Sequence, residues 1–182
     1  MKKNYILSFF LILCLIINEI NAQTEWIGPT ATIAKEDFAD WTLPANQDAL
    51  TTNVILTRAN NRGIFNIAQE TEYDNVDYTS PLDTEWAIGT IADGVGELTF
   101  DTWDNTHLGN PSSIIDIDLV LHLITDNIYI DIKIIAWTSG NDGGGGGFVY
   151  ERSTDQSLSI SEIELDNRIK LFPNPSNEFI QI

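Results

Sequence analysis

Side chains that could carry chemistry gather in residues 122–137 of this sequence. His122 is one of 2 histidines, the other being His107. If residues 114–137 fold as a hairpin, His122 lies opposite Asp131, whose carboxylate could orient the imidazole as a general base. A plain cross-strand pair on a half-buried sheet is the commoner outcome. Because the sequence also lacks the G-x-S-x-G and H-E-x-x-H motifs and a cysteine nucleophile, we assign no catalytic residue.

Two aromatic residues in the same stretch, Tyr129 and Trp137, are candidates for stacking on sugar rings. The chain has 5 tryptophans, and in a β-sandwich most of them belong to the core. The expected hairpin nevertheless places Tyr129 and Trp137 on the same face as His122 and Asp131, a face that mixes polar and apolar residues. These four residues are therefore the predicted ligand-binding set, with polysaccharide as the predicted ligand.

Two loops contain enough carboxylates to suggest a calcium site. The first loop contains Asp74, Asp77 and Asp83, and the second contains Asp93 and Glu97 close to two glycines. Calcium prefers oxygen ligands, which an acidic exported domain offers in number. Neither loop has the ligand spacing of an EF-hand, and solvated surface charge is the alternative explanation. Calcium is the cofactor that we expect if the domain binds an ion.

The charge of the chain limits its partners. Asp and Glu number 27 against 9 Lys and Arg, and the formal net charge is -18 at pH 7. Such a negative field repels phosphate groups, so we expect neither nucleic acid nor an anionic membrane as a partner. Cations and neutral polymers remain. The acidic residues are scattered among tryptophans and isoleucines, which favours a folded acidic domain over a disordered one.

Residues 24–155 have the patterning of an all-β domain. No segment keeps apolar residues at helical spacing for long, whereas period-2 alternation is common. Strands are expected over 51–57, 63–68, 84–91, 97–103 and 148–150, with turns at 60–63, 80–81, 93–96 and 109–111. Short strands separated by turns at this spacing are typical of a β-sandwich or jelly roll. We therefore expect one domain of that class.

The clearest predicted element is the hairpin over residues 114–137. Asp126 and Asn127 tolerate positive φ and suit a two-residue turn. That turn pairs Leu123 with Ile130, Leu121 with Ile132, Leu119 with Ile134, and Ile117 with Ala136 on one apolar face. On the mixed face it pairs His122 with Asp131, Val120 with Lys133, Asp118 with Ile135, Asp116 with Trp137, and Ile124 with Tyr129. A four-residue loop with the same register gives the same faces, whereas a three-residue loop would mix them.

Five consecutive glycines, residues 143–147, precede the strand expected over 148–150. They do not match a phosphate-binding loop, because no Lys-Ser or Lys-Thr pair and no helix follows them. A flexible hairpin loop is the simplest interpretation. The alternative is that a ligand approaches the backbone there, since glycine permits close contact.

Residues 1–22 have the composition of a secretory signal peptide, which we expect to be helical. Two lysines precede an apolar run over 5–17, and a polar tail ends at Ala22. A transmembrane helix needs about 20 apolar residues and this run is shorter, so we expect cleavage between Ala22 and Gln23 and no membrane span afterwards. Cys14 would leave with this peptide, and the exported chain would contain no disulfide.

Two prolines mark the C-terminal run K-L-F-P-N-P-S-N, residues 170–177. Proline cannot donate to a strand ladder, so the run is an edge strand or the beginning of a new domain. It resembles the start of the type A C-terminal sorting domain of type IX secretion cargo, in which a strand beginning L-F-P-N-P follows a linker. The resemblance implies export by that machinery, with a linker over 156–169 and the start of the sorting domain over 170–182. The family's domain continues well past this motif, so its later strands would be missing here.

The central domain has a second resemblance. The run H-L-I-T-D-N-I-Y over 122–129 is followed by Asp131, Trp137, the G-G-G-F of 145–148, Tyr150, Arg152 and Ser153. This combination is similar to one in uncharacterised secreted bacterial β proteins. The resemblance supports a folded domain over 24–155 and implies no reaction.

These observations together predict a protein that acts outside the cell or on its surface. The expected function is a non-catalytic binding or adhesion module, for example one that binds glycans. The alternative is a carbohydrate-active hydrolase or lyase on a jelly-roll scaffold, since glycoside hydrolases use paired carboxylates. A structural surface-layer component is a third possibility. A concave mixed face with convergent carboxylates would favour the enzyme, a flat one with exposed rings would favour the binding module, and a covered face would favour neither.

Overall fold

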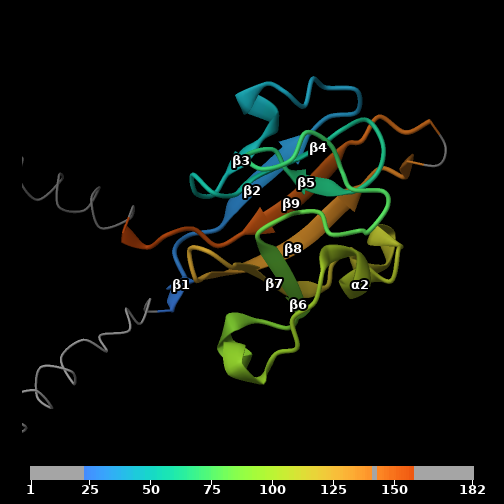
Figure 1. Ribbon diagram of the computed structural model, residues 1–182. Coiled ribbons are helices and arrows are strands. Elements are labelled where there is room, and N and C mark those ends of the chain that lie inside the picture. The colour runs from blue at the N-terminus through green and yellow to red at the C-terminus, as the bar shows by residue number, and fades with distance from the viewer. Residues whose placement is uncertain (1–22, 141–142, 158–182) are drawn as a thin grey trace, which may run out of the picture.

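The structure is a computed structural model that describes residues 23–140 and 143–157 of the 182-residue chain (Figure 1). The predicted signal peptide over 1–22 and the predicted start of a sorting domain over 170–182 lie outside these residues. The predicted linker over 156–169 lies outside them after residue 157. Within the described ranges, no helix has the length and apolar composition needed to cross a membrane.

Strands dominate the described residues. They are β1 (Thr24–Trp26), β2 (Ala31–Lys35), β3 (Asp48–Ala49), β4 (Ile55–Arg58), β5 (Ile64–Asn66), β6 (Thr84–Ile88), β7 (Asp118–Leu123), β8 (Ile128–Trp137) and β9 (Phe148–Arg152). The α-helix in this part of the chain is the short α2 (Trp103–His107), and 3₁₀ turns cover Pro44–Asn46, Ile91–Asp93, Val95–Glu97 and Pro111–Ile114.

The strands form two sheets that pack face to face, which confirms the expected all-β, sandwich-like fold. The larger, 6-stranded sheet has the order β2-β9-β8-β7-β6, and β1 pairs parallel with the first residues of β8. The smaller sheet has 3 strands in the order β3-β4-β5. Figure 1 shows the smaller sheet over β2, β9 and β8, with α2 close to β6.

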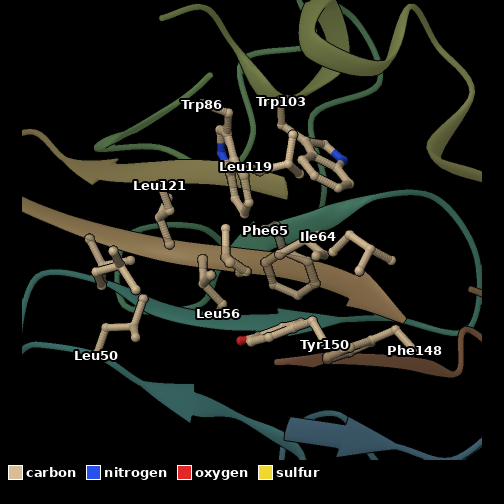
Figure 2. Packing of buried hydrophobic residues seen from close by; sticks show 14 of the residues in the cluster. Leu50, Leu56, Ile64, Phe65, Trp86, Trp103, Leu119, Leu121, Phe148 and Tyr150 are labelled. Atoms are coloured by element: carbon tan, nitrogen blue, oxygen red, sulfur yellow. The ribbon is translucent and has the colours of Figure 1, made fainter. Parts of the chain in front are cut away.

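The core lies between the two sheets, because apolar side chains at every second strand position point to the same face. The core residues Leu119, Leu121, Leu123, Ile130, Ile132 and Ile134 of β7 and β8 are at most 3% exposed. Leu56 and Phe65 of the smaller sheet pack against this face (Figure 2). Trp86 of β6 and Trp103 of α2 extend the core, with ring centroids 4.7 Å apart.

The predicted hairpin exists and its apolar face is confirmed, but its register is wrong by two residues. β7 and β8 pair Leu123 with Ile128, Leu121 with Ile130, and Leu119 with Ile132. The loop comprises residues 124–127 instead of the predicted two-residue turn. A shift of two residues leaves every side chain on its face, because the side-chain period of a strand is two. The buried face was therefore predictable although the cross-strand partners were not.

A β-bulge in β8 separates Tyr129 from Trp137. The pairing of β8 with β9 shifts register between Ile134 and Ala136, and the extra residue in a bulge turns the following side chains to the other face. Ala136 is consequently exposed, and Trp137 packs against the core. The predictions that Trp137 shares a face with Tyr129, and that Ala136 belongs to the apolar face, are both wrong.

The strand expected over 97–103 does not form. Of these residues, Asp101 makes an isolated bridge with Trp86, and Trp103 begins α2. The Thr102 hydroxyl caps this helix by accepting a hydrogen bond from Asn105 N at 3.3 Å. An N-cap of this kind stabilises the first turn of a helix. A helix therefore begins at the end of a segment whose apolar alternation predicted a strand.

The strand expected over 51–57 begins later, at Ile55. The Thr51 hydroxyl accepts hydrogen bonds from the backbone N–H groups of Asn53 and Val54, at 3.1 and 3.2 Å. Threonine hydroxyls hold turns in this way. The first half of the predicted strand is therefore a turn.

The last three residues of the glycine run, 145–147, are buried against other segments of the chain. A Cβ on Gly145 would lie 2.4 Å from Phe38 N, and a Cβ on Gly146 would lie 1.9 Å from Ala59 O. Only glycine permits such close backbone approach. The prediction of a flexible loop is therefore wrong for these three residues. The alternative was that a ligand approaches the glycine backbone, and here other segments of the same chain make that close approach.

An ion pair joins the two sheets. Arg152 of β9 donates from Nε and Nη2 to the two carboxylate oxygens of Asp48 in β3, each at 2.7 Å. The Tyr150 hydroxyl donates to the same carboxylate at 2.7 Å. A bidentate pair of this geometry is strong and directional, so it holds the smaller sheet in one position over β9.

Candidate functional site

Three of the four predicted ligand-binding residues lie on the outer face of the larger sheet, the face turned away from the smaller sheet. On this face His122 lies opposite Tyr129, so the predicted pair of His122 with Asp131 is wrong. The rings of His122 and Tyr129 stack with centroids 4.1 Å apart and an interplanar angle of 4°. Phe100 meets both rings edge-on, with centroids 5.8 and 5.7 Å away. The rings therefore form a cluster packed on one another.

Both ring nitrogens of His122 face oxygen atoms of neighbouring side chains. Nδ1 lies 2.8 Å from Glu85 Oε1, and Nε2 lies 3.4 Å from Asn127 Oδ1. The residue is 8% exposed. A ring held at both nitrogens and covered on its face offers little to a substrate. We interpret His122 as part of the packing of the outer face, and Tyr129 as its half-buried neighbour.

Asp131 lies in a separate shallow hollow of about 360 Å³ on the same face. Its Oδ1 accepts a hydrogen bond from Ile91 N at 2.7 Å. Burial raises the pKa of the Asp131 carboxyl, and the negative charge of Asp118 raises it further. Asp118 itself forms an ion pair with Lys133 at 2.7 Å. The hollow thus contains one carboxyl whose pKa lies above the usual range of aspartate, although the hydrogen bond from Ile91 opposes the shift.

Trp137 lines a second cavity, which we call the end cleft, with a volume of about 430 Å³. The cleft is formed by the loop between β4 and β5, the loop between β5 and β6, the region of α2, and the segment after β8. Its lining includes Arg58, Asn61, Arg62, Tyr73, Tyr78, Asp104, His107, Asn110 and Trp137. Loops that a rigid scaffold brings together in this way are common places for binding sites.

Aromatic rings form part of the wall of the end cleft. Tyr78 is 47% exposed and has a φ of 56°, an uncommon backbone conformation for a bulky residue. The buried Tyr73 donates from its hydroxyl to Asp104 Oδ1 at 3.3 Å. The Arg58 guanidinium covers one face of the Trp137 ring, with Cζ 3.7 Å from the ring centroid. Tyr78 is therefore the ring open to a ligand, whereas Tyr73 and Trp137 are held in place.

His107 is the buried histidine of the end cleft. It lines the cleft but is only 3% exposed. Within the described part of the chain, neither Nδ1 nor Nε2 has a hydrogen-bond partner. Burial lowers the pKa of His107, so the ring is neutral at pH 7 and has one donor and one acceptor nitrogen. Unpartnered buried polar groups are rare in folded proteins. Both nitrogens are themselves buried and the ring packs edge-on against Trp103, with centroids 4.7 Å apart, so His107 belongs to the wall of the cleft and offers no polar atom to a ligand.

Three of the five carboxylates predicted to bind calcium accept hydrogen bonds from the protein. The donors are the backbone N–H groups of Val76 and Asp77 for Asp74, of Thr125 for Asp83, and of Thr90 for Asp93. In residues 23–140 and 143–157, which include Asp77 and Glu97, no group of three or more His, Cys, Asp or Glu is arranged to hold a metal ion. Calcium binding therefore stays a prediction.

Sequence patterns pointed to Trp137 but not to its neighbours in the end cleft. Arg62 and Tyr78 come from two separate loops and His107 from the end of α2, and no spacing rule connects them. The signals in the sequence were weak: a turn at 60–63, and the fact that His107 is one of 2 histidines.

Comparison with known proteins identifies no relative. No protein-family model, no curated protein and no solved structure matches this chain. Function is therefore inferred from the residues of the outer face and the end cleft.

Proposed function

We propose that this protein is exported to the cell surface or beyond, and that its β-sandwich is a non-catalytic binding module whose end cleft holds a glycan. The observation that carries the proposal is the composition of the cleft. An exposed ring, Tyr78, lies among polar side chains that include Asn61, Arg62 and Asn110. A sugar ring offers an apolar face for the aromatic ring and hydroxyl groups for the polar side chains.

The dimensions of the end cleft suit a small ligand or one unit of a polymer. Its volume of about 430 Å³ lies within the about 300–1,000 Å³ typical of small-molecule sites. The fixed positions of Tyr73 and Trp137 mean that part of the wall exists before a ligand arrives. Preorganised walls reduce the entropy lost on binding.

The sequence supports the exported location. Residues 1–22 have the composition of a signal peptide, and the L-F-P-N-P run resembles the start of a sorting domain. The type IX secretion machinery is therefore the proposed partner in export, and polysaccharide outside the cell is the proposed ligand.

A glycan array probed with the full chain tests the proposal, using Tyr78→Ala and Phe38→Ala as a matched pair. Phe38 is also an exposed aromatic residue with positive φ, 60° against 56° for Tyr78, and it lies outside the cleft lining. We expect Tyr78→Ala to weaken glycan binding about 5- to 10-fold, the effect of one aromatic contact, and Phe38→Ala to leave it unchanged. Equal binding by the two variants, or the absence of any bound glycan, would contradict the proposal.

A carbohydrate-active hydrolase or lyase is the second candidate, and Asp131 is the observation in its favour. A general acid in a glycosidase needs a raised pKa and a second carboxylate nearby. The pKa of Asp131 is raised by burial, and Asp118 and Glu151 line the same hollow.

The release of reducing ends from polysaccharides distinguishes the two candidates. If Asp131 is a general acid, Asp131→Asn abolishes the release, whereas Asp77→Asn, at an exposed carboxylate elsewhere, does not. Activity that persists in Asp131→Asn would remove this role for Asp131.

A further inference from the structure

The charge of the end cleft differs from that of the chain as a whole. The chain contains 27 Asp and Glu against 9 Lys and Arg. Among the described residues, two arginines, Arg58 and Arg62, line the cleft together with one acidic residue, Asp104. The cleft is therefore a locally positive place on a strongly negative protein.

Arg62 is the basic side chain that is available to a ligand. It is exposed, and within residues 23–140 and 143–157 its guanidinium has neither a hydrogen-bond nor an ion-pair partner. The other basic side chains of these ranges are engaged: Lys133 pairs with Asp118, Arg152 pairs with Asp48, and Lys35 and Arg58 donate to carbonyl oxygens. Within the described residues, Arg62 is therefore the basic side chain of the cleft whose hydrogen-bond donors are not already used.

The backbone at Arg62 is held in a specific conformation. Its φ is 71°, in the left-handed region that residues other than glycine rarely adopt. Arg58 Nε donates to Arg62 O at 2.8 Å and fixes this turn against the wall of the cleft. Arg62 and Tyr78 are two of the seven described non-glycine residues with positive φ, and both line this cleft.

Arg58 adds positive charge behind the cleft. Its Nη1 and Nη2 donate to Gly147 O and Thr138 O, both at 2.8 Å, and no carboxylate pairs with it in the described residues. Burial lowers the pKa of Arg58 to about 10, so the guanidinium still carries its charge at pH 7. A buried charge surrounded by carbonyl groups acts on a ligand over a longer distance than a solvated one, because water screens it less.

From these observations we infer that the glycan in the end cleft carries a carboxylate, as a uronic acid residue does, and that this carboxylate binds the guanidinium of Arg62. The inference rests on the proposed function and names the class of its ligand. The planar guanidinium matches a carboxylate with two parallel hydrogen bonds. Tyr78 then faces the sugar ring, and the amide groups of Asn61 and Asn110 in the cleft lining are available to its hydroxyls.

A uronate suits this protein better than a polyphosphate does. The net charge of -18 repels any polyanion at a distance, and it repels a polyphosphate more strongly than a uronate, whose single charges are spaced one per sugar ring. Within the cleft, the two arginines attract the single carboxylate of a uronate. This attraction acts over about one Debye length, roughly 8–10 Å at physiological salt. Salt should therefore weaken the binding of a uronate more than that of a neutral sugar.

Calorimetric titration of the full chain tests the inference with matched ligands. The ligands are oligogalacturonate and oligoalginate, each compared with its carboxyl-reduced counterpart, which keeps the sugar backbone and loses the charge. The variants are Arg62→Gln and Lys133→Gln. Both remove one positive charge from the protein, but Lys133 lies on the outer face, away from the cleft lining.

We expect at least one uronate series to bind about tenfold or more tightly than its reduced counterpart, the usual effect of a charge-assisted pair. Arg62→Gln should abolish this preference, Arg62→Lys should retain part of it, and Lys133→Gln should leave it intact. If the unfolding curves of Arg62→Gln match those of the unsubstituted protein, the variant is folded, and the lost preference for the uronate is an effect on binding.

Three results would overturn the inference, and only the last of them also contradicts the proposed function. If a neutral glycan binds through Tyr78 with no preference for a carboxylate, or if Arg62→Gln keeps the preference, the inference fails and the glycan-binding function stands. If no charged or neutral glycan binds at all, both fail together.

Discussion

The packing of the glycine run leads to a stability prediction that can be worked out from the structure. Gly146 has a φ of +72°, and a Cβ there would lie 1.9 Å from Ala59 O. Gly146→Ala therefore combines two costs: a left-handed conformation for a residue with a Cβ, and a clash with backbone that cannot rotate away. Two other glycines separate these costs. Gly143 has a φ of +69° and open space within 4 Å of where a Cβ would lie, and Gly96 has neither a positive φ nor a close contact.

The magnitudes follow from these contacts. The left-handed conformation costs about 1–2 kcal/mol for a residue with a Cβ, and forced overpacking adds about 1–3 kcal/mol. Gly146→Ala should then lose about 2–5 kcal/mol of a domain stability of typically about 5–15 kcal/mol. Gly143→Ala should lose about 1–2 kcal/mol, and Gly96→Ala should be neutral or stabilising by up to about 1 kcal/mol.

Urea unfolding followed by tryptophan fluorescence measures all three variants. With a slope of about 2 kcal/mol per molar urea, in the middle of the usual range, the midpoint for Gly146→Ala should fall by about 1–2.5 M. The order of the midpoints, from highest to lowest, should be Gly96→Ala, then Gly143→Ala, then Gly146→Ala. If Gly146→Ala and Gly143→Ala have the same midpoint, the close contact with Ala59 does not exist, and the glycine run is the flexible loop that its composition suggests.

The remaining predictions concern the core, the outer face, ions and processing. Leu121→Ala should lower the free energy of unfolding by about 2–5 kcal/mol in urea titrations, because the side chain is 0% exposed; a loss near zero would contradict the core. Asp131→Asn should be at least as stable as the unsubstituted protein at pH 7, because the raised pKa of Asp131 means that ionisation disfavours the fold. That difference should shrink as the pH falls through the raised pKa of the folded state toward about 3.9, the usual value of the unfolded state, and should be absent below about pH 3, where the carboxyl is protonated in both states. A less stable variant at pH 7 would show that the bond to Ile91 dominates. Millimolar calcium should raise the melting temperature relative to chelator if the loop carboxylates bind it, and identical melting would count against a calcium site. Intact mass of the exported protein should correspond to a chain that begins at Gln23, and retention of residues 1–22 would refute the signal peptide.

The hairpin shows which structural features the sequence pattern could predict and which it could not. Leu119, Leu121 and Leu123 could be assigned to one buried face because alternation depends only on the period of the strand. The register depended on the loop, and residues 124–127 form a longer loop than the Asp126 and Asn127 pair suggested. The error of two residues preserved the faces, since it was an even number.

The candidate sites were less predictable than the faces. Trp137 was expected beside Tyr129, and a single bulge between Ile134 and Ala136 turned it to the other side of the sheet. No local sequence pattern predicts that bulge, because it forms where β9 pairs with β8. The partner of His122 changed from Asp131 to Tyr129 for the same kind of reason, a register set at the loop.

By itself, the sequence determined the class of the fold, the buried face of the hairpin and the strongly negative charge, because each of these depends on composition or on a repeat along the chain. The tertiary structure decided which loops meet. It brought Arg62, Tyr78 and His107 to one cleft, and it placed Ala59 against Gly146. Such contacts join residues far apart in the chain, and they depend on how two sheets pack and how their loops end, which no local spacing specifies.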